Sequence, residues 1–350
     1  MSQERHEDTG AAHGPGSAQP PVTGPGNMVV FTYLDANGEE AYANGLSGAG
    51  TPPPEFRIWA DLRGKGVRAD DVVAVHSDLS PVDLPGAYRM KFIRETFRNA
   101  RLSHSHEYGI VQPSRAAGMA ALVEQADTMR RLAGGTPRPR ANRAPLSPDP
   151  RSEGPMADGE LARLLEETFP EVQRYDPAAM AHTLLPEPTR ATLATAGLPV
   201  TVPYFFAADT PGHPPIGGLF TDAATHVSQR NTRAAGPAME TLAGHVRIGS
   251  DGGAVVTVQC TGAEDGIGRV WAADIGTGTG RYINASVTEL GRCLALLTET
   301  LPRVAGKDPY AAGELIARFQ DRLAGIDPSV FGDPENWWAV IVEQMWDGLL

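Results

Sequence analysis

The sequence predicts two domains of different fold class: an α/β sandwich in the N-terminal part and an α+β domain in the C-terminal part. Three observations support this prediction. Helix and strand patterns alternate before residue 132. Strand patterns then predominate from about residue 200 to 286, before helices close the chain. Six prolines interrupt residues 131–156, where they prevent regular structure.

Composition sets the expected boundaries. Residues 1–26 hold Gly, Pro, Ser and charged residues with almost no large apolar side chain, so we expect a disordered tail there. The first domain then covers residues 27–132, and the second covers 157–350. Between them, residues 133–156 form a Pro/Arg-rich linker, whose charge run is typical of a solvated spacer and could also contact an acidic partner.

The elements of the first domain follow from hydrophobic periodicity and from turn residues. We expect strands at 28–35, 70–79 and 100–109, a turn and loop from 36 to 54, and helices at 56–66, 87–100 and 115–132.

The second domain opens with a predicted helix and becomes rich in strands separated by Gly-containing turns. We expect helices at 159–169, 286–301 and 333–350, and strands at 202–209, 245–260, 269–275 and 280–286. In the closing helix, Asp333 can act as the cap and Pro334 suits the first position. Its apolar stripe consists of Trp338, Ile341, Val342, Met345 and Leu349.

Charge argues against two classes of partner. The net charge is −12, of which −11 falls in residues 156–350, and this argues against non-specific binding to nucleic acid or to an anionic membrane. Two cysteines, Cys260 and Cys293, cannot build a disulfide framework, and both lie in apolar patterns typical of buried residues. With no apolar run of membrane-spanning length and no leader pattern, we expect a cytoplasmic protein.

Three further patterns have both a functional and a structural interpretation. The glycine-rich stretch 276–280 leads into a strand rather than a helix, which predicts a hairpin turn and not a phosphate site. His104 and His106 have the spacing of metal ligands on one strand face, and His76 lies on another strand; surface or hydrogen-bonded histidines are the commoner explanation. The predicted helix 87–100 and its end carry a basic face, typical of a solvated surface, formed by Lys91, Arg94, Arg98 and Arg101.

Residues 55–109 resemble bacterial nucleic-acid and nucleotide deaminases of toxin systems. The residues that carry the resemblance are Glu55 and the stretch from Ser77 to Arg89, which contains Leu84-Pro85-Gly86 and Tyr88. The resemblance implies a deaminase fold in which a histidine and two cysteines bind zinc and the glutamate moves a proton. Pro53, Val82 and Arg89 stand at the three ligand positions, and none of these side chains binds zinc. We therefore expect a pseudoenzyme with no cofactor, in which Glu55 is a remnant.

Residues from about 156 to 350 resemble the SUKH superfamily, in particular its fourth immunity group in actinobacteria. The segments that carry this resemblance, in order along the chain, are 198–199, 202–205, 248–253, 270–274, 282–286 and 333–338. The resemblance implies a non-enzymatic α+β scaffold that binds a protein, often a nuclease or deaminase toxin. Such an acidic domain would meet a basic nucleic-acid-processing enzyme faster because their charges are complementary.

The sequence therefore predicts a non-catalytic immunity or regulatory factor that binds a protein partner. Candidate contact residues are Trp337, Asp251, Asp274, Arg94 and Arg98, although burial is the expected position of Trp337 as of Trp338. Two alternatives stay open. One is an active base deaminase with an unconventional metal site of His76, His104 and His106 with Glu55, and the other is a sensor that binds a nucleotide without turnover.

Overall fold

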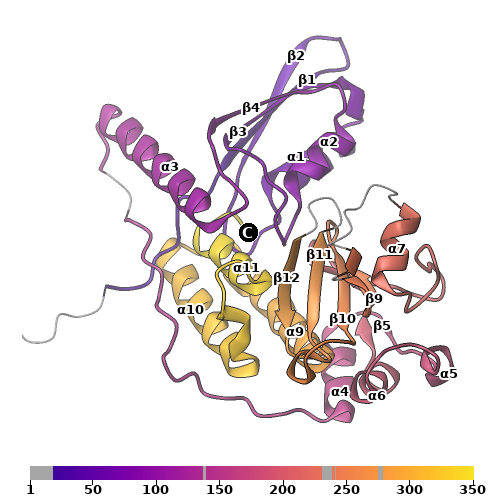
Figure 1. Cartoon of the computed structure of the whole chain (residues 1–350). Helices are drawn as coiled ribbons and strands as arrows, with labels where there is room; N and C mark the ends of the chain where they lie inside the picture. The colour runs from indigo at the N-terminus through magenta and orange to yellow at the C-terminus, as the bar shows by residue number, and fades with distance from the viewer. Residues whose placement is uncertain (1–18, 137–138, 231–238, 241, 275–278) are drawn as a thin grey trace, which may run out of the picture.

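The computed structural model describes residues 19–136, 139–230, 239–240, 242–274 and 279–350. Figure 1 shows two parts: a sheet with three helices from the N-terminal region, and a larger α+β part in which helix α11 (Trp337–Trp346) lies at the junction with the first. The predicted disordered tail at 1–18 and most of the predicted hairpin turn, 275–278, lie outside the described residues.

The N-terminal sheet has four strands in the order β2-β1-β3-β4. Strand β1 is antiparallel to both of its neighbours, whereas β3 and β4 are parallel. The predicted strands are present, and β2 is an additional strand where the sequence indicated a turn and loop. The bounds are β1 Met28–Leu34, β2 Glu40–Leu46, β3 Val72–Leu79 and β4 Arg101–His106.

Three helices pack against one face of this sheet. Helix α1 (Pro54–Gly64) and helix α2 (Arg89–Thr96) cover an apolar cluster that includes Val29, Phe31 and Val75. Helix α3 (Gln112–Leu132) contacts β3 and β4 further along. Because α2 ends at Thr96, the predicted basic helix face is divided: Arg94 lies on α2, Arg98 follows its end, and Arg101 begins β4.

The C-terminal part contains a six-stranded antiparallel sheet in the order β12-β11-β10-β9-β8-β7. Its strands are β7 Thr201–Val202, β8 Phe206–Ala208, β9 His245–Ser250, β10 Val255–Gln259, β11 Val270–Asp274 and β12 Thr279–Asn284. A separate pair is formed by β5 (Val172–Gln173) and β6 (Leu198–Pro199). The predicted α+β organisation of this region is therefore present.

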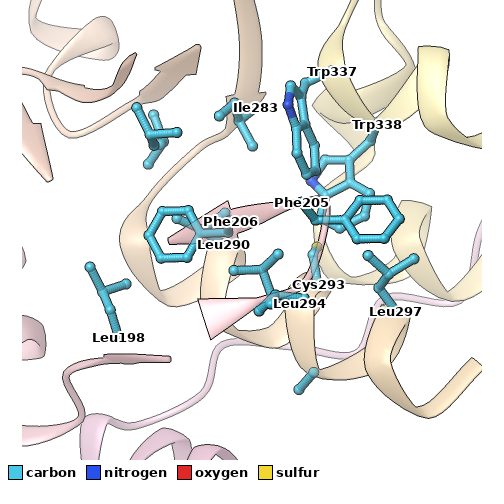
Figure 2. Packing of buried hydrophobic residues seen from close by; sticks show 14 of the residues in the cluster. Leu198, Phe205, Phe206, Ile283, Leu290, Cys293, Leu294, Leu297, Trp337 and Trp338 are labelled. Carbon is cyan, nitrogen blue, oxygen red and sulfur yellow. The ribbon is translucent and has the colours of Figure 1, made fainter. Parts of the chain in front are cut away.

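Helices pack on this sheet through one large apolar cluster. In Figure 2, Trp337 and Trp338 lie beside Phe205, and Cys293 and Leu294 of α9 belong to the same cluster. Helix α9 begins after Ser286, whose hydroxyl accepts a hydrogen bond from the amide of Thr288, as expected for an N-cap. The helices are α4 Asp158–Thr168, α5 Pro177–Met180, α6 Glu187–Thr195, α7 Ala223–Arg230, α9 Val287–Val304, α10 Pro309–Ile326 and α11 Trp337–Trp346.

The closing helix starts later than the sequence predicted. Asn336, not Asp333, is the residue before the first turn of α11, and Pro334 lies ahead of the helix. Asp333 instead accepts a hydrogen bond from the amide of Glu335. This local bond forms a turn, which places Glu335 before the helix rather than on it. The predicted burial of Trp337 and Trp338 is confirmed, at 1% and 0% exposure.

Residues 19–26 are ordered against the C-terminal part, so the prediction of a disordered tail is wrong for this segment. Val22 is buried and exchanges two backbone hydrogen bonds of 2.9 Å with Asn142. The amide of Gly24 donates to the carbonyl of Trp346 at 2.7 Å. Backbone hydrogen bonds to residues far away in the sequence order this segment. Such bonds cannot be predicted from the composition of the segment.

The linker region is also attached to the C-terminal domain. Arg143 donates to Asp347 at 2.6 Å, and Glu153 accepts from Arg322 at 3.0 Å. Both residues are exposed, so the segment is solvated as predicted and is in addition bonded to the C-terminal domain. Residues 133–136 are exposed and precede the attached stretch.

We expect native-state proteolysis to cut first at residues 133–136, because this exposed backbone can be extended into a protease site without breaking the packed stretch. Mass spectrometry should locate the cut, and size-exclusion chromatography should show both fragments eluting together, since the two parts are joined by contacts outside the linker. Initial cleavage within 143–153, or separation of the fragments, would contradict this expectation.

Candidate functional site

Two ionisable side chains are buried at the starts of α1 and α2, and the charge of one acts on the other. Glu55, in the first turn of α1, is 0% exposed, and its carboxylate oxygens accept no hydrogen bond from any described residue. Burial raises the pKa of Glu55, and the positive charge of Arg89 opposes that rise. Arg89, the first residue of α2, is also buried, and its two terminal nitrogens have no described hydrogen-bond partner.

The residues that stand at the three zinc-ligand positions of the deaminase resemblance cannot bind a zinc ion. Pro53 precedes α1 and is buried, and Val82 packs against an apolar cluster. A pyrrolidine ring and an isopropyl group have no lone pair to donate, and the guanidinium of Arg89 stays protonated and repels a cation. The remnant Glu55 thus lies near a fixed positive charge supplied by the chain itself.

The three candidate histidines do not converge. Strands β3 and β4 are neighbours, and His76 is in register with Ser103 while Ser77 is in register with His104. Since side chains alternate between the two faces of a sheet, His76 faces away from the side of His104 and His106. His76 bonds to Ser103 at 3.0 Å, and His104 bonds to Glu107 at 2.9 Å.

His106 bonds to Gln125 of α3, on the helix-covered face. The proposed metal site of three histidines with Glu55 is therefore not assembled. Across the described ranges, no group of three or more His, Cys, Asp and Glu residues is placed to hold a metal ion.

The two cysteines are not activated. Cys293 lies fully buried in the apolar cluster, and burial raises its pKa. Burial likewise raises the pKa of Cys260 to about 11. At neutral pH both thiols stay protonated, which agrees with the structural role that the sequence predicted.

The candidate residue Asp251 lies at the junction between the two parts of the chain and accepts hydrogen bonds from both. The hydroxyl of Tyr88 donates to Asp251 at 2.6 Å, and the indole of Trp337 donates to the same carboxylate oxygen at 2.8 Å. The other oxygen of Asp251 accepts from the amide of Ala254 at 2.7 Å. Asp251 therefore holds together its own turn, the closing helix and the N-terminal domain.

The turn at 250–253 is shaped to receive the Tyr88 ring. A Cβ atom on Gly253 would lie 1.9 Å from that ring, so only glycine fits at this position. Tyr88 itself has a φ of 48°, a conformation that costs a bulky residue free energy. This strained backbone directs the ring into the second domain.

A buried ion cluster forms a second connection. Arg115 of α3 is 0% exposed and donates from two nitrogens to one carboxylate oxygen of Glu343, at 3.0 and 2.8 Å. It also donates to Glu335 at 3.1 Å, and Arg281 donates to Glu335 at 2.7 Å. Partial burial acts to raise the pKa of Glu335, but the bonds from Arg281 and Arg115 hold it below its usual value.

An apolar seam completes the junction. It joins β3 and α3 to the closing helix and the C-terminus, and its buried members are Leu79, Leu84, Tyr108, Met119, Leu122, Val340 and Leu349. Gln344 donates to the carbonyl of Pro85 at 2.8 Å, and a Cβ on Gly86 would lie 2.4 Å from Leu350. The Leu84-Pro85-Gly86 stretch is thus a contact surface for the second domain.

The remaining candidate residues occupy different surroundings. Asp274 ends β11 and lines a cavity of about 300 Å³ between the two parts, together with Asp83, Tyr88 and Arg281. Arg94 and Arg98 are exposed. Trp337 is buried and bonded to Asp251, so its candidate role as an exposed anchor for a separate partner is wrong.

Sequence reasoning missed the importance of Arg115, Glu335 and Glu343. Arg115 and Glu343 are 228 positions apart, and no local pattern connects them. The one available signal was charge inside otherwise apolar helix faces, which predicts a buried partner of opposite charge without identifying it.

Comparison with known protein families accounts for both parts of the chain. Residues 24–125 match the model of a family described as a Xanthomonas-like deaminase. Neither the search of curated proteins nor that of solved structures finds a match. Among the described helices, none is long and apolar enough to cross a membrane. Residues 160–344, more than half of the chain, match the SUKH-4 immunity protein model, and the chain therefore belongs to the SUKH-4 immunity protein family.

Proposed function

We propose that this protein is a non-catalytic, protein-binding immunity or regulatory factor whose deaminase-like domain is a pseudoenzyme. The observation that carries the proposal is the buried Arg89, whose positive charge acts on the buried Glu55. A zinc deaminase needs the metal to ionise a water molecule near neutral pH, and a carboxylate alone cannot lower the pKa of water that far. Arg89 fills a ligand position with a permanent cation, which also opposes binding of Zn²⁺.

The second domain supports the protein-binding half of the proposal. SUKH-4 is a family of immunity proteins by description, and residues 156–350 carry a net charge of −11. Complementary charge increases the rate at which such a surface meets a basic protein. A toxin or another nucleic-acid-processing enzyme is the class of partner that this charge suits.

We expect the purified protein to contain far less than one zinc per chain and to release no ammonia from cytosine or adenine compounds. The reason is that Pro53, Val82 and Arg89 supply no zinc ligand. Inductively coupled plasma mass spectrometry measures the zinc content. A deaminase assay on nucleosides and single-stranded nucleic acid measures the activity.

The matched control restores the ligands. A variant with Pro53→His, Val82→Cys and Arg89→Cys should gain zinc, because these substitutions place one imidazole and two thiols at the ligand positions. One tightly held zinc in the wild-type protein, lost on His104→Ala or His106→Ala, would overturn the pseudoenzyme proposal and favour the histidine site.

A further inference from the structure

The C-terminal domain presents one continuous surface to the deaminase-like domain. We call it the docking surface and define it by the turn 250–253, Glu335, and α11 with the residues that follow it to Leu350. Two of its carboxylates are deeply buried in the junction: Asp251 is 2% exposed and Glu343 is 6% exposed. Buried carboxylates require hydrogen-bond donors, because an unpaired buried charge is strongly unfavourable. Asp251 has donors on both sides of the junction, whereas the hydrogen bonds to Glu343 come from Arg115 of the other domain.

The deaminase-like domain meets this surface with two elements. The first is the loop 84–88, which supplies the packing of Leu84, the carbonyl of Pro85 and the hydroxyl of Tyr88. The second is Arg115 at the start of α3. The loop ends immediately before Arg89, so docking takes place next to the buried Glu55–Arg89 pair.

The fit is selective in shape and in charge. Gly253 leaves space for an aromatic ring at one position, and Gly86 leaves space for Leu350 at another. Asp251 accepts from the hydroxyl of Tyr88 in addition to the indole of Trp337, and Glu343 accepts from the guanidinium of Arg115. A partner must therefore present a Leu-Pro-Gly-x-Tyr loop and an arginine in the same relative positions.

The docking surface also has acceptor capacity that its own domain does not use. One carboxylate oxygen of Glu343 and one of Asp347 accept no hydrogen bond from the described residues, and Arg143 of the linker lies 3.9 Å from that oxygen of Glu343 and bonds the other oxygen of Asp347. On the opposite side, the hydroxyl of Tyr108 and the terminal nitrogens of Arg89 are similarly without a described partner. The pairing within one chain therefore leaves polar groups on both sides that a related domain could satisfy differently.

We propose that the docking surface is a recognition site for deaminase-like domains that carry this loop, occupied by the chain's own domain and open to a second such domain when that one is displaced. This inference rests on the proposed protein-binding function and names its partner class. A linker of 133–156 keeps the chain's own domain at high effective concentration, so a second domain binds only when the internal contact is weakened.

Two full-length variants test the proposal, with a second copy of this chain as the probe. The loop variant carries Tyr88→Phe and Arg115→Ala and keeps the docking surface intact. The surface variant carries Glu335→Gln and Glu343→Gln and keeps the loop and Arg115 intact. Neither variant can form the complete contact by itself, because one side of the contact is altered in each. In the mixture, the docking surface of the loop variant can bind the loop and Arg115 of the surface variant.

We expect each variant alone to sediment as a monomer and the equimolar mixture to sediment as a heterodimer, with an association at least about tenfold tighter than that of either variant with itself. Two control variants, Glu187→Gln and Arg190→Ala, alter the two partners of an exposed ion pair away from the junction. Each should sediment as a monomer, both alone and when the two are mixed. If a double variant loses its cooperative melt, Arg115→Lys and Glu343→Gln make the same comparison as single changes.

A mixture that stays monomeric would overturn the inference and leave the docking surface as internal packing only. That result would not affect the zinc and deaminase measurements, which test the proposed function. Conversely, zinc-dependent activity in the wild-type protein would overturn the pseudoenzyme proposal without changing the sedimentation result. The two failures are therefore distinguishable.

Discussion

Deleting residues 333–350 is expected to remove the cooperative unfolding transition of the whole protein. This segment contributes three fully buried tryptophans, at positions 337, 338 and 346, to the large apolar cluster. It also contributes Val340 and Leu349 to the seam with the N-terminal domain. Deletion of the segment exposes apolar residues of both clusters to water. The free energy of unfolding of a domain is only about 5–15 kcal/mol, so the remaining contacts cannot compensate for this exposure.

A single substitution measures the same effect on a smaller scale. Trp338→Ala should lower the free energy of unfolding by about 3–5 kcal/mol, because it leaves a cavity in the core and removes the hydrogen bond of 2.9 Å to Asn284. Urea unfolding followed by circular dichroism gives the value. Tyr310→Ala, at a partly exposed position of α10, is the matched control and should change stability by much less. A truncated protein with an unchanged melt would show that the helix is an appendage.

Arg115→Ala is expected to have the second largest effect, about 3–5 kcal/mol of lost stability. The substitution removes the guanidinium that donates two hydrogen bonds to the buried carboxylate of Glu343, whereas the half-buried Glu335 keeps Arg281. The control Arg68→Ala breaks an exposed ion pair with Asp71 and should change stability far less, because solvent and salt screen an exposed pair. Denaturant unfolding of each variant gives the comparison.

A double-mutant cycle separates the lost pairing from lost packing. Replacing both partners, Arg115→Met with Glu343→Met, should recover most of the stability, since two apolar side chains of similar size leave no unpaired charge. If the double variant is as unstable as Arg115→Ala, the ion pair is not the origin of the effect and the packing of the arginine stem is.

The relation between domains illustrates what local patterns can and cannot predict. The deaminase-like motif was recognisable in the sequence from Leu84-Pro85-Gly86 and Tyr88, and so was the absence of zinc ligands at Pro53, Val82 and Arg89. The same loop turned out to be the contact with the second domain, bonded to Asp251 and Gln344. A motif predicts its local backbone, but its neighbours across 163 positions depend on the packing of the whole chain.

Strand β2 and the histidines show two further limits. The segment 40–46 alternates small, polar and aromatic residues, which gave no apolar pattern, and it becomes a strand through its pairing with β1. His76, His104 and His106 share a residue type that suits zinc, but the register of β3 with β4 puts His76 on the opposite face. Register is a property of two strands together, so neither strand's sequence contains it.

From the sequence we could predict the two-domain arrangement, the α+β class of the second domain, most helices and strands, the two family resemblances and the buried stripe of the closing helix, because these depend on periodicity and short motifs within one segment. The order of residues 19–26, the bond of Arg115 to Glu343 and the entry of Tyr88 into the turn beside Asp251 became visible in the folded chain alone. These contacts join residues far apart in the chain. Their free energy depends on burial and geometry that exist only after both domains have folded and packed together.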